Sequence, residues 1–83
     1  MYNIEFDKKA ADFFKKLDKS LQNRIGKKIE LLKNNPHLGI PLVGNLSGFY
    51  KLRVGDYRIV YKIKNEQLII LILDIGHRKN IYN

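Results

Sequence analysis

The sequence contains no cysteine, few acidic residues and no long apolar run. Without cysteine the chain can form no disulfide bond, thiolate nucleophile or sulfur-ligated zinc site, which is typical of proteins in a reducing cytosol. No stretch approaches the roughly 20 apolar residues of a membrane-spanning helix, and the amino end lacks the basic start and apolar run of a signal peptide. We therefore expect a cytoplasmic protein that does not bind membranes.

Acidic residues are scarce, and their spacing and number indicate whether the chain binds a metal and what kind of partner it has. The eight carboxylates and two histidines show no spacing typical of metal ligands, so the sequence predicts no metal and no small-molecule cofactor. Sixteen Lys and Arg residues outnumber the carboxylates and give a net charge of +8. Such an excess is expected where the partner is a nucleic acid or an acidic protein.

The length of 83 residues predicts one domain that spans residues 1–83, because chains usually divide only beyond about 250 residues. Hydrophobic residues make up 45% and charged residues 29% of the chain. This balance is ordinary for globular proteins and unlike that of disordered chains.

Hydrophobic periodicity predicts a helical first half. Tyr2–Phe6 alternates in polarity and is predicted to be a short strand, after which Asp7 offers a helix N-cap. Apolar residues over Lys8–Leu17 follow the spacing of an amphipathic helix. A second helix is expected from a cap at Ser20 until Asn34-Asn35-Pro36, because proline excludes the helical conformation in the residue before it.

The second half of the chain is predicted to form a loop followed by three strands. Residues 35–48 hold both prolines and are predicted to be a loop. Three strand-like runs follow, namely Phe49–Val54, Tyr57–Lys64 and Gln67–Ile75. The connections Gly55-Asp56 and Asn65-Glu66 predict tight antiparallel hairpins. The expected fold is α+β with the order β-α-α-β-β-β, in which a helical hairpin covers one face of a small antiparallel sheet.

The first predicted hairpin places like charges opposite one another. A loop at Gly55-Asp56 makes Arg53 the cross-strand neighbour of Arg58. Since strand side chains alternate, one face then carries Lys51, Arg53, Arg58 and Lys62, and the other carries Leu52, Val54, Ile59, Tyr61 and Ile63. Facing like charges destabilise a sheet by a few tenths of a kcal/mol or more, which a bound anion would offset. The alternative is a solvated polar face without a ligand.

The sequence leaves open which face of the sheet His77 and Arg78 occupy. The run Gln67–Ile75 is apolar on both faces and is predicted to be the central strand. Strict alternation beyond it places His77 on the face of Arg58, whereas a bulge at Gly76 would re-aim both His77 and Arg78.

Two segments together resemble a known family. The run YKLRVGDYRIVY at residues 50–61, an apolar strand and GHRKNIY at residues 76–82 resemble the signature of the RelE/ParE superfamily of toxins from toxin-antitoxin systems. The resemblance implies the RelE-like microbial RNase fold and a ribosome-dependent endoribonuclease that cleaves mRNA through attack by the ribose 2'-hydroxyl. It implies mRNA, the ribosome with its rRNA and a cognate antitoxin protein as partners.

The resemblance also implies which residues carry the chemistry. Its catalytic set falls on Lys51, Arg53, Arg58, Arg78 and Tyr82, and His77, Lys79 and Lys62 become candidate substrate contacts. Guanidinium and ammonium groups can stabilise the charge that develops on an attacked phosphodiester. A late tyrosine can stack on a base or orient the 2'-hydroxyl. Lys51 and His77 both remain candidates for the general base.

Two other functions are compatible with the same fold. ParE-like members inhibit DNA gyrase through protein contact and lack the basic catalytic set. An inactive, RNA-binding relative is the third possibility, since a fold hosts many functions. The basic residues of the strand half favour the nuclease.

Overall fold

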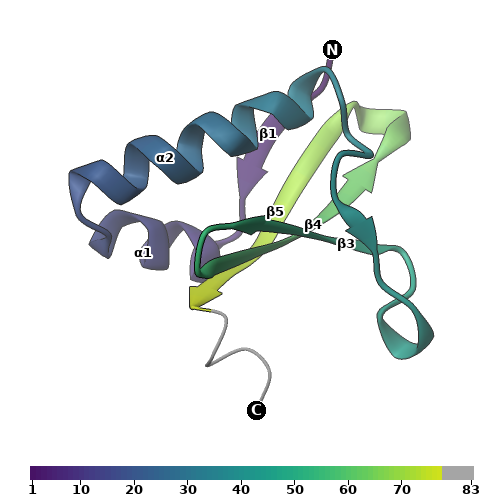
Figure 1. The fold of residues 1–83 in the computed structure, drawn as a ribbon. Coiled ribbons are helices and arrows are strands. Elements are labelled where there is room, and N and C mark those ends of the chain that lie inside the picture. The colour runs from purple at the N-terminus through teal and green to yellow at the C-terminus, as the bar shows by residue number, and fades with distance from the viewer. Residues whose placement is uncertain (78–83) are drawn as a thin grey trace.

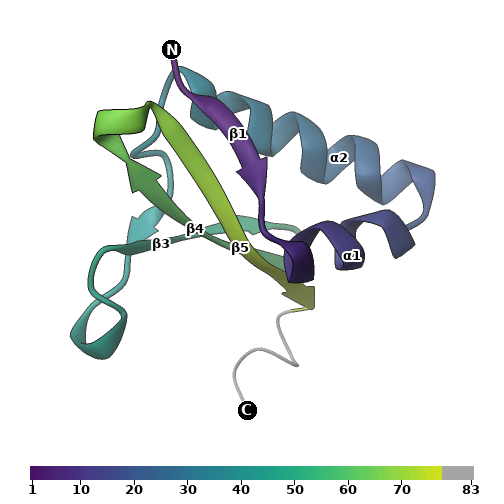
Figure 2. The same ribbon diagram turned by 180° about the vertical axis from the view of Figure 1, so that it is seen from behind.

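Two helices cover one face of a five-stranded sheet in the computed structural model, which describes residues 1–77 (Figures 1 and 2). The elements are β1 (Asn3–Phe6), α1 (Lys8–Lys16), α2 (Lys19–Glu30), β2 (Ile40–Pro41), β3 (Phe49–Val54), β4 (Tyr57–Lys64) and β5 (Ile69–His77). Short 3-10 turns occupy Leu31–Lys33, Gly44–Leu46 and Asn65–Gln67. The α+β class and the helical hairpin on one sheet face are confirmed.

The sheet is mixed, whereas the sequence led us to expect antiparallel pairing throughout. The strand order is β1-β5-β4-β3-β2, and β1 runs parallel to β5 while the other neighbours are antiparallel. The chain between these two parallel strands runs through both helices and β2, β3 and β4, so it has the length that a parallel pair requires. As predicted, β5 has neighbours on both sides, β1 and β4, but the middle strand of the five is β4 and not β5.

The two helices begin at aspartates. Asp7 caps α1 as predicted, because its carboxylate accepts the Ala10 N–H at 3.0 Å. The cap of α2 is Asp18, which accepts the Leu21 N–H at 2.9 Å, and not Ser20. Both residue types cap well, so composition alone did not distinguish them.

One of the two predicted hairpin turns is confirmed, and the other is longer than predicted. The β3–β4 turn at Gly55-Asp56 is as predicted. The β4–β5 connection is longer than two residues, because a 3-10 turn runs to Gln67 and Leu68 adopts a left-handed conformation with φ 56°. Strand β5 consequently starts at Ile69 instead of Gln67.

The core lies between the helices and the sheet. It contains Ala10, Ile25, Ile29, Leu32, Leu52, Val54, Ile59, Tyr61, Ile70, Ile72 and Ile75. Every strand residue in this set lies on the helix-covered face, and the opposite face carries charged side chains together with the apolar Val60 and Leu71. That opposite face is called the open face below.

Candidate nucleic-acid interface

The β3–β4 hairpin has the predicted register. Arg53 pairs with Arg58, Leu52 with Ile59 and Lys51 with Val60. The turn is compatible with this register because Gly55 adopts φ +59°, a left-handed conformation that costs glycine little. The two arginines therefore form the second cross-strand pair from the turn, after Val54 and Tyr57.

The open face gathers the predicted basic side chains. Leu52, Val54 and Ile59 are buried under the helices, so their alternating neighbours Lys51, Arg53, Arg58 and Lys62 lie on the open face. Arg53 and Lys62 are exposed, whereas Lys51 and Arg58 are half-buried. The ammonium of Lys62 lies 5.9 Å from the ring centre of Phe49, its partner on β3. The structure thus brings together the four basic residues that the sequence placed on one face.

Arg58 occupies the centre of this face. Its neighbours are Arg53 on β3 and Gly76 on β5. Because Gly76 has no side chain, β5 places no side chain directly opposite Arg58 on this face, and the Nε atom of Arg58 is buried. A half-buried arginine held this way presents its donors in a nearly fixed direction, which suits an anion with several oxygens.

His77 lies on the face opposite to the one that strict alternation predicts. Val60 pairs with Asp74 and Tyr61 with Ile72, so Leu73 is an extra residue in β5. This bulge reverses the alternation and pairs His77 with Tyr57. The rings of His77 and Tyr57 are 5.4 Å apart, and Tyr57 also contacts Phe13 of α1 at 6.4 Å. Of the two alternatives left open for His77, strict alternation is therefore wrong, and a bulge re-aims the side chain from Leu73 instead of from Gly76.

Three members of the predicted site, Arg78, Lys79 and Tyr82, lie outside the described residues. Their assignment stays a prediction.

Sequence reasoning treated Tyr61 as a packing residue and missed its polar role. Its hydroxyl donates to the Pro36 carbonyl at 2.7 Å and accepts the Gly39 N–H at 2.9 Å, and its ring stacks on Tyr50 at 5.3 Å. Burial raises the pKa of this hydroxyl, the bond from Gly39 partly opposes that rise, and Tyr50 adds to it. Tyr61 therefore fastens the 36–39 loop against the sheet.

Gly39 brings that loop close to the strand that carries Lys51. A Cβ at Gly39 would lie 2.7 Å from the Lys51 carbonyl oxygen and 2.8 Å from the Tyr61 hydroxyl. The next residue, Ile40, pairs with Lys51. The glycine in the Pro/Gly-rich segment was the available sequence signal for this close approach.

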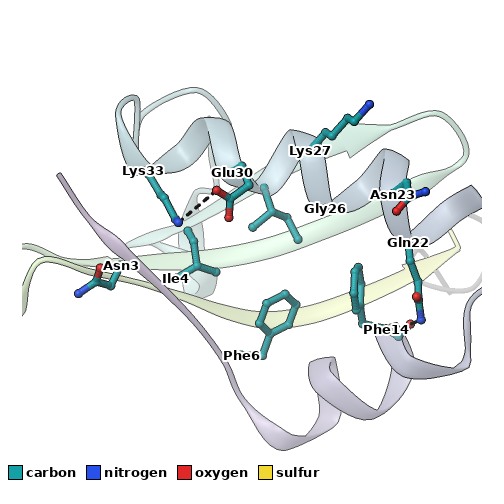
Figure 3. Close-up of a pocket in the computed structure, with 11 residues that line it drawn as sticks. Asn3, Ile4, Phe6, Phe14, Gln22, Asn23, Gly26, Lys27, Glu30 and Lys33 are labelled. Carbon is teal, nitrogen blue, oxygen red and sulfur yellow. Dashed lines mark hydrogen bonds and ion pairs between the residues drawn. The ribbon is translucent and has the colours of Figure 1, made fainter. Parts of the chain in front are cut away.

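A cavity of about 710 Å³ lies elsewhere, between β1 and α2 (Figure 3). Ile4, Phe6 and Phe14 point toward it, and the Lys33–Glu30 ion pair of 3.1 Å lies at its edge. It opens on the helix side of the sheet, away from Arg53 and Arg58. Its lining combines apolar side chains with Lys27, Glu30 and Lys33, whereas the open face groups four basic side chains on neighbouring strands. The open face is therefore the better candidate for nucleic acid.

Residues 1–77 contain neither a candidate metal-binding group nor a candidate membrane-spanning helix. In that part of the chain no group of three or more His, Asp or Glu side chains is placed to hold a metal ion. No helix there combines the length and apolar character needed to cross a membrane.

Comparison with known proteins adds the family to this geometry. Residues 4–82 match the family described as the ParE toxin of the type II toxin-antitoxin system parDE. The chain belongs to the RelE/ParE toxin superfamily. A putative RelE-like toxin protein of Escherichia coli is 34% identical over 99% of this chain and 90% of its own length.

Other superfamily members support the same conclusion. The mRNA interferase toxin RelE of Escherichia coli K12 is 25% identical over 94% of this chain and 84% of its own length. The RelBE2 toxin-antitoxin complex of Mycobacterium tuberculosis contains a chain with a TM-score of 0.83 and 29% identity, covering 93% of this toxin and 98% of that chain. The protein is thus a RelE-like toxin of a type II toxin-antitoxin system, and the RelE-like fold expected from the sequence is confirmed.

Proposed function

We propose that this toxin is a metal-independent endoribonuclease that cleaves mRNA on the ribosome, and hence acts in the cytoplasm. The observation that carries the proposal is the cross-strand pair of Arg53 and Arg58 beside Lys51 on the open face. An unoccupied row of like charges costs stability, and a phosphodiester backbone would offset that cost. A superfamily member of similar length is an mRNA interferase, which supports RNA as the phosphodiester.

The reaction assigned to this face is an in-line transesterification. The ribose 2'-oxygen attacks the neighbouring phosphorus while the bond from phosphorus to the 5'-oxygen breaks, which leaves a cyclic phosphate and a free 5'-hydroxyl. The 2'-hydroxyl proton passes to a base, and the leaving 5'-oxygen gains a proton. Negative charge accumulates on the phosphoryl oxygens, where preorganised donors contribute most to the rate.

The residues take distinct parts in this reaction. Arg58 and Arg78 are assigned to the phosphoryl oxygens, and Arg53 to the neighbouring phosphate. Of the two candidate bases, Lys51 shares the face of Arg58 and His77 does not, so Lys51 is preferred. Tyr82 would stack on a base, and Lys62 and Lys79 would contact flanking phosphates.

A cognate antitoxin is the expected protein partner, because a superfamily structure with 29% identity is a toxin-antitoxin complex. With a net charge of +8 on the toxin, an acidic antitoxin that covers the open face would inhibit RNA binding by direct competition.

The proposal is tested at Arg58 under tightly controlled expression. Arg58→Ala should lower ribosome-dependent cleavage about 10²- to 10³-fold, as expected when one transition-state donor is removed. Arg58→Lys should recover only part of the activity, since an ammonium lacks the planar fork. Lys8→Ala is the charge-matched control, because Lys8 lies on α1 in an exposed ion pair with Asp12 at 3.1 Å.

The readouts are the 5' ends of transcripts mapped on and off ribosomes, with thermal melting to show that each variant is folded. Full cleavage by a folded Arg58→Ala variant would reject the nuclease site. The family description as a ParE toxin makes gyrase inhibition the second candidate. Inhibition of supercoiling by the purified toxin without ribosomes would favour that candidate.

A further inference from the structure

Arg24 connects helix α2 to the tip of the β3–β4 hairpin. A Cβ built at Gly55 would lie 2.8 Å from one terminal guanidinium nitrogen of Arg24 and 3.5 Å from the other. The Arg24 guanidinium therefore lies against the Gly55-Asp56 turn. Arg53 and Arg58 are each two residues from this turn, on β3 and β4. A third cationic group thus stands at the turn, on the helix side of the sheet.

Lys28 extends this charge along α2. It follows Arg24 by four residues, so the two side chains leave the same flank of the helix. Within residues 1–77 the ion pairs use Lys8, Lys9 and Lys33, and neither Arg24 nor Lys28 takes part in one. Like charges at this spacing destabilise a helix slightly, which is the same kind of cost as in the Arg53–Arg58 pair.

Within residues 1–77, β2 pairs with only part of the β3 edge that lies between these two basic sets. Strand β2 pairs with Tyr50 and Lys51 only, so it does not reach the half of β3 next to the turn. Helix α2 packs against β3 on the other side. Basic side chains therefore occur on the open face, beside the turn and on the flank of α2, and these three groups together are called the band below.

We propose that Arg24 and Lys28 form a second phosphate-binding site for the same RNA strand, which leaves the open face around the hairpin tip and continues along α2. This inference rests on the proposed function, since it extends the RNA path beyond the reacting phosphate. Single-stranded RNA suits such a path because its flexible backbone can follow a curved basic surface over several nucleotides. Asp56 in the turn is acidic and would face the bases instead of the phosphates.

The experiment measures how salt weakens binding of a fluorescent 2'-O-methyl oligoribonucleotide of roughly a dozen nucleotides, comparable to single-strand site sizes. Blocking the 2'-oxygen prevents cleavage. The test variant is Arg24→Gln with Lys28→Gln. The control is Lys8→Gln with Lys33→Gln, which removes the same charge from residues that form ion pairs with Asp12 and Glu30.

Each phosphate contact contributes about 0.7 to the slope of log affinity against log salt for single strands. We expect the test variant to lower the slope by about 1.4 and the control to leave it unchanged. Equal slopes for the test variant and the wild type would overturn the second site. The proposed function would then still stand if Arg58→Ala abolishes cleavage. If wild-type toxin shows no salt-dependent RNA binding, both the second site and the nuclease proposal fail.

Discussion

At the scale of single residues, Tyr61 links the core to the loop behind the basic face. The side chain is fully buried, and its hydroxyl has partners on both sides, the Gly39 N–H and the Pro36 carbonyl. Removing a buried hydrogen-bonding group costs mainly through the partner groups that it leaves behind. The stability of this corner therefore depends on the hydroxyl oxygen of Tyr61 as well as on the packing of its ring.

Tyr61→Phe should lower the free energy of unfolding by about 1–3 kcal/mol, because Gly39 N–H and Pro36 C=O lose a buried partner while the ring packing remains. Denaturant unfolding at pH 7 measures the change. Tyr2→Phe serves as the control, since that hydroxyl donates to Asn65 at an exposed site. An equal loss in both variants would contradict the special role of Tyr61.

The same hydroxyl predicts a pH dependence. Burial raises the pKa of Tyr61 above its unfolded value near 10, so the folded protein holds this proton more tightly than the unfolded chain does. The corresponding stability is present in full below about pH 10 and is lost as pH rises through the folded pKa. The difference in unfolding free energy between wild type and Tyr61→Phe should therefore shrink above about pH 10. A difference that is constant from neutral pH to pH 11 would contradict the buried, bonded hydroxyl.

The positions of some residues in the candidate site could be predicted from the sequence, and the positions of others could not. The pairing of Arg53 with Arg58 follows from a two-residue turn and strict alternation, both of which are local. The placement of His77 depends on a bulge at Leu73, and nothing in a run of isoleucine and leucine marks which residue is extra. Arg24 at the hairpin tip depends on tertiary packing and has no local signal.

At the scale of elements, two glycines occupy opposite environments. Gly39 lies where the loop crosses β3, and an added Cβ would meet backbone, 2.7 Å from the Lys51 carbonyl oxygen. Gly26 lies inside α2, where an added Cβ would make an ordinary contact of 3.8 Å with Phe14. The same substitution should therefore act in opposite directions.

Gly39→Ala should destabilise the fold by about 1–3 kcal/mol, because the loop or β3 must shift to relieve the overlap. Gly26→Ala should stabilise it by about 0.5–1 kcal/mol through helix propensity. Thermal melting of both variants measures the effects. A stable Gly39→Ala variant would show that the loop does not cross β3 so closely.

Hydrophobic periodicity in the sequence predicted some of the helices and strands and missed others. Apolar spacing located both helices and the three long strands, because each buries a regular face. It missed β2, whose two residues, Ile40 and Pro41, are both exposed and have no periodicity to detect. It also gave no direction for β1, since a strand of four residues reads the same whether its neighbour is parallel or antiparallel.

At the scale of the whole molecule, positive charge occupies both the helical layer and the sheet. Lys8, Lys9 and Lys33 pair with Asp12, Asp74 and Glu30 at 3.1 to 3.6 Å. The basic side chains of the open face and the α2 flank lie outside these pairs as a joined surface. Composition predicted the excess of charge, but only the fold shows which charges share a surface.

This joined surface predicts how an antitoxin and RNA exclude each other. We expect a cognate acidic antitoxin to release the uncleavable RNA from the toxin, because both partners would require the cations around Arg53. Fluorescence anisotropy during titration with antitoxin measures the release. The charge-matched control, Lys8→Gln with Lys33→Gln, should bind antitoxin with nearly wild-type affinity. Lys51→Gln with Arg53→Gln should bind both RNA and antitoxin more weakly, and less steeply with salt. A stable ternary complex would place the antitoxin away from the open face, and inhibition would then have to act through the conformation of the toxin instead of by direct competition.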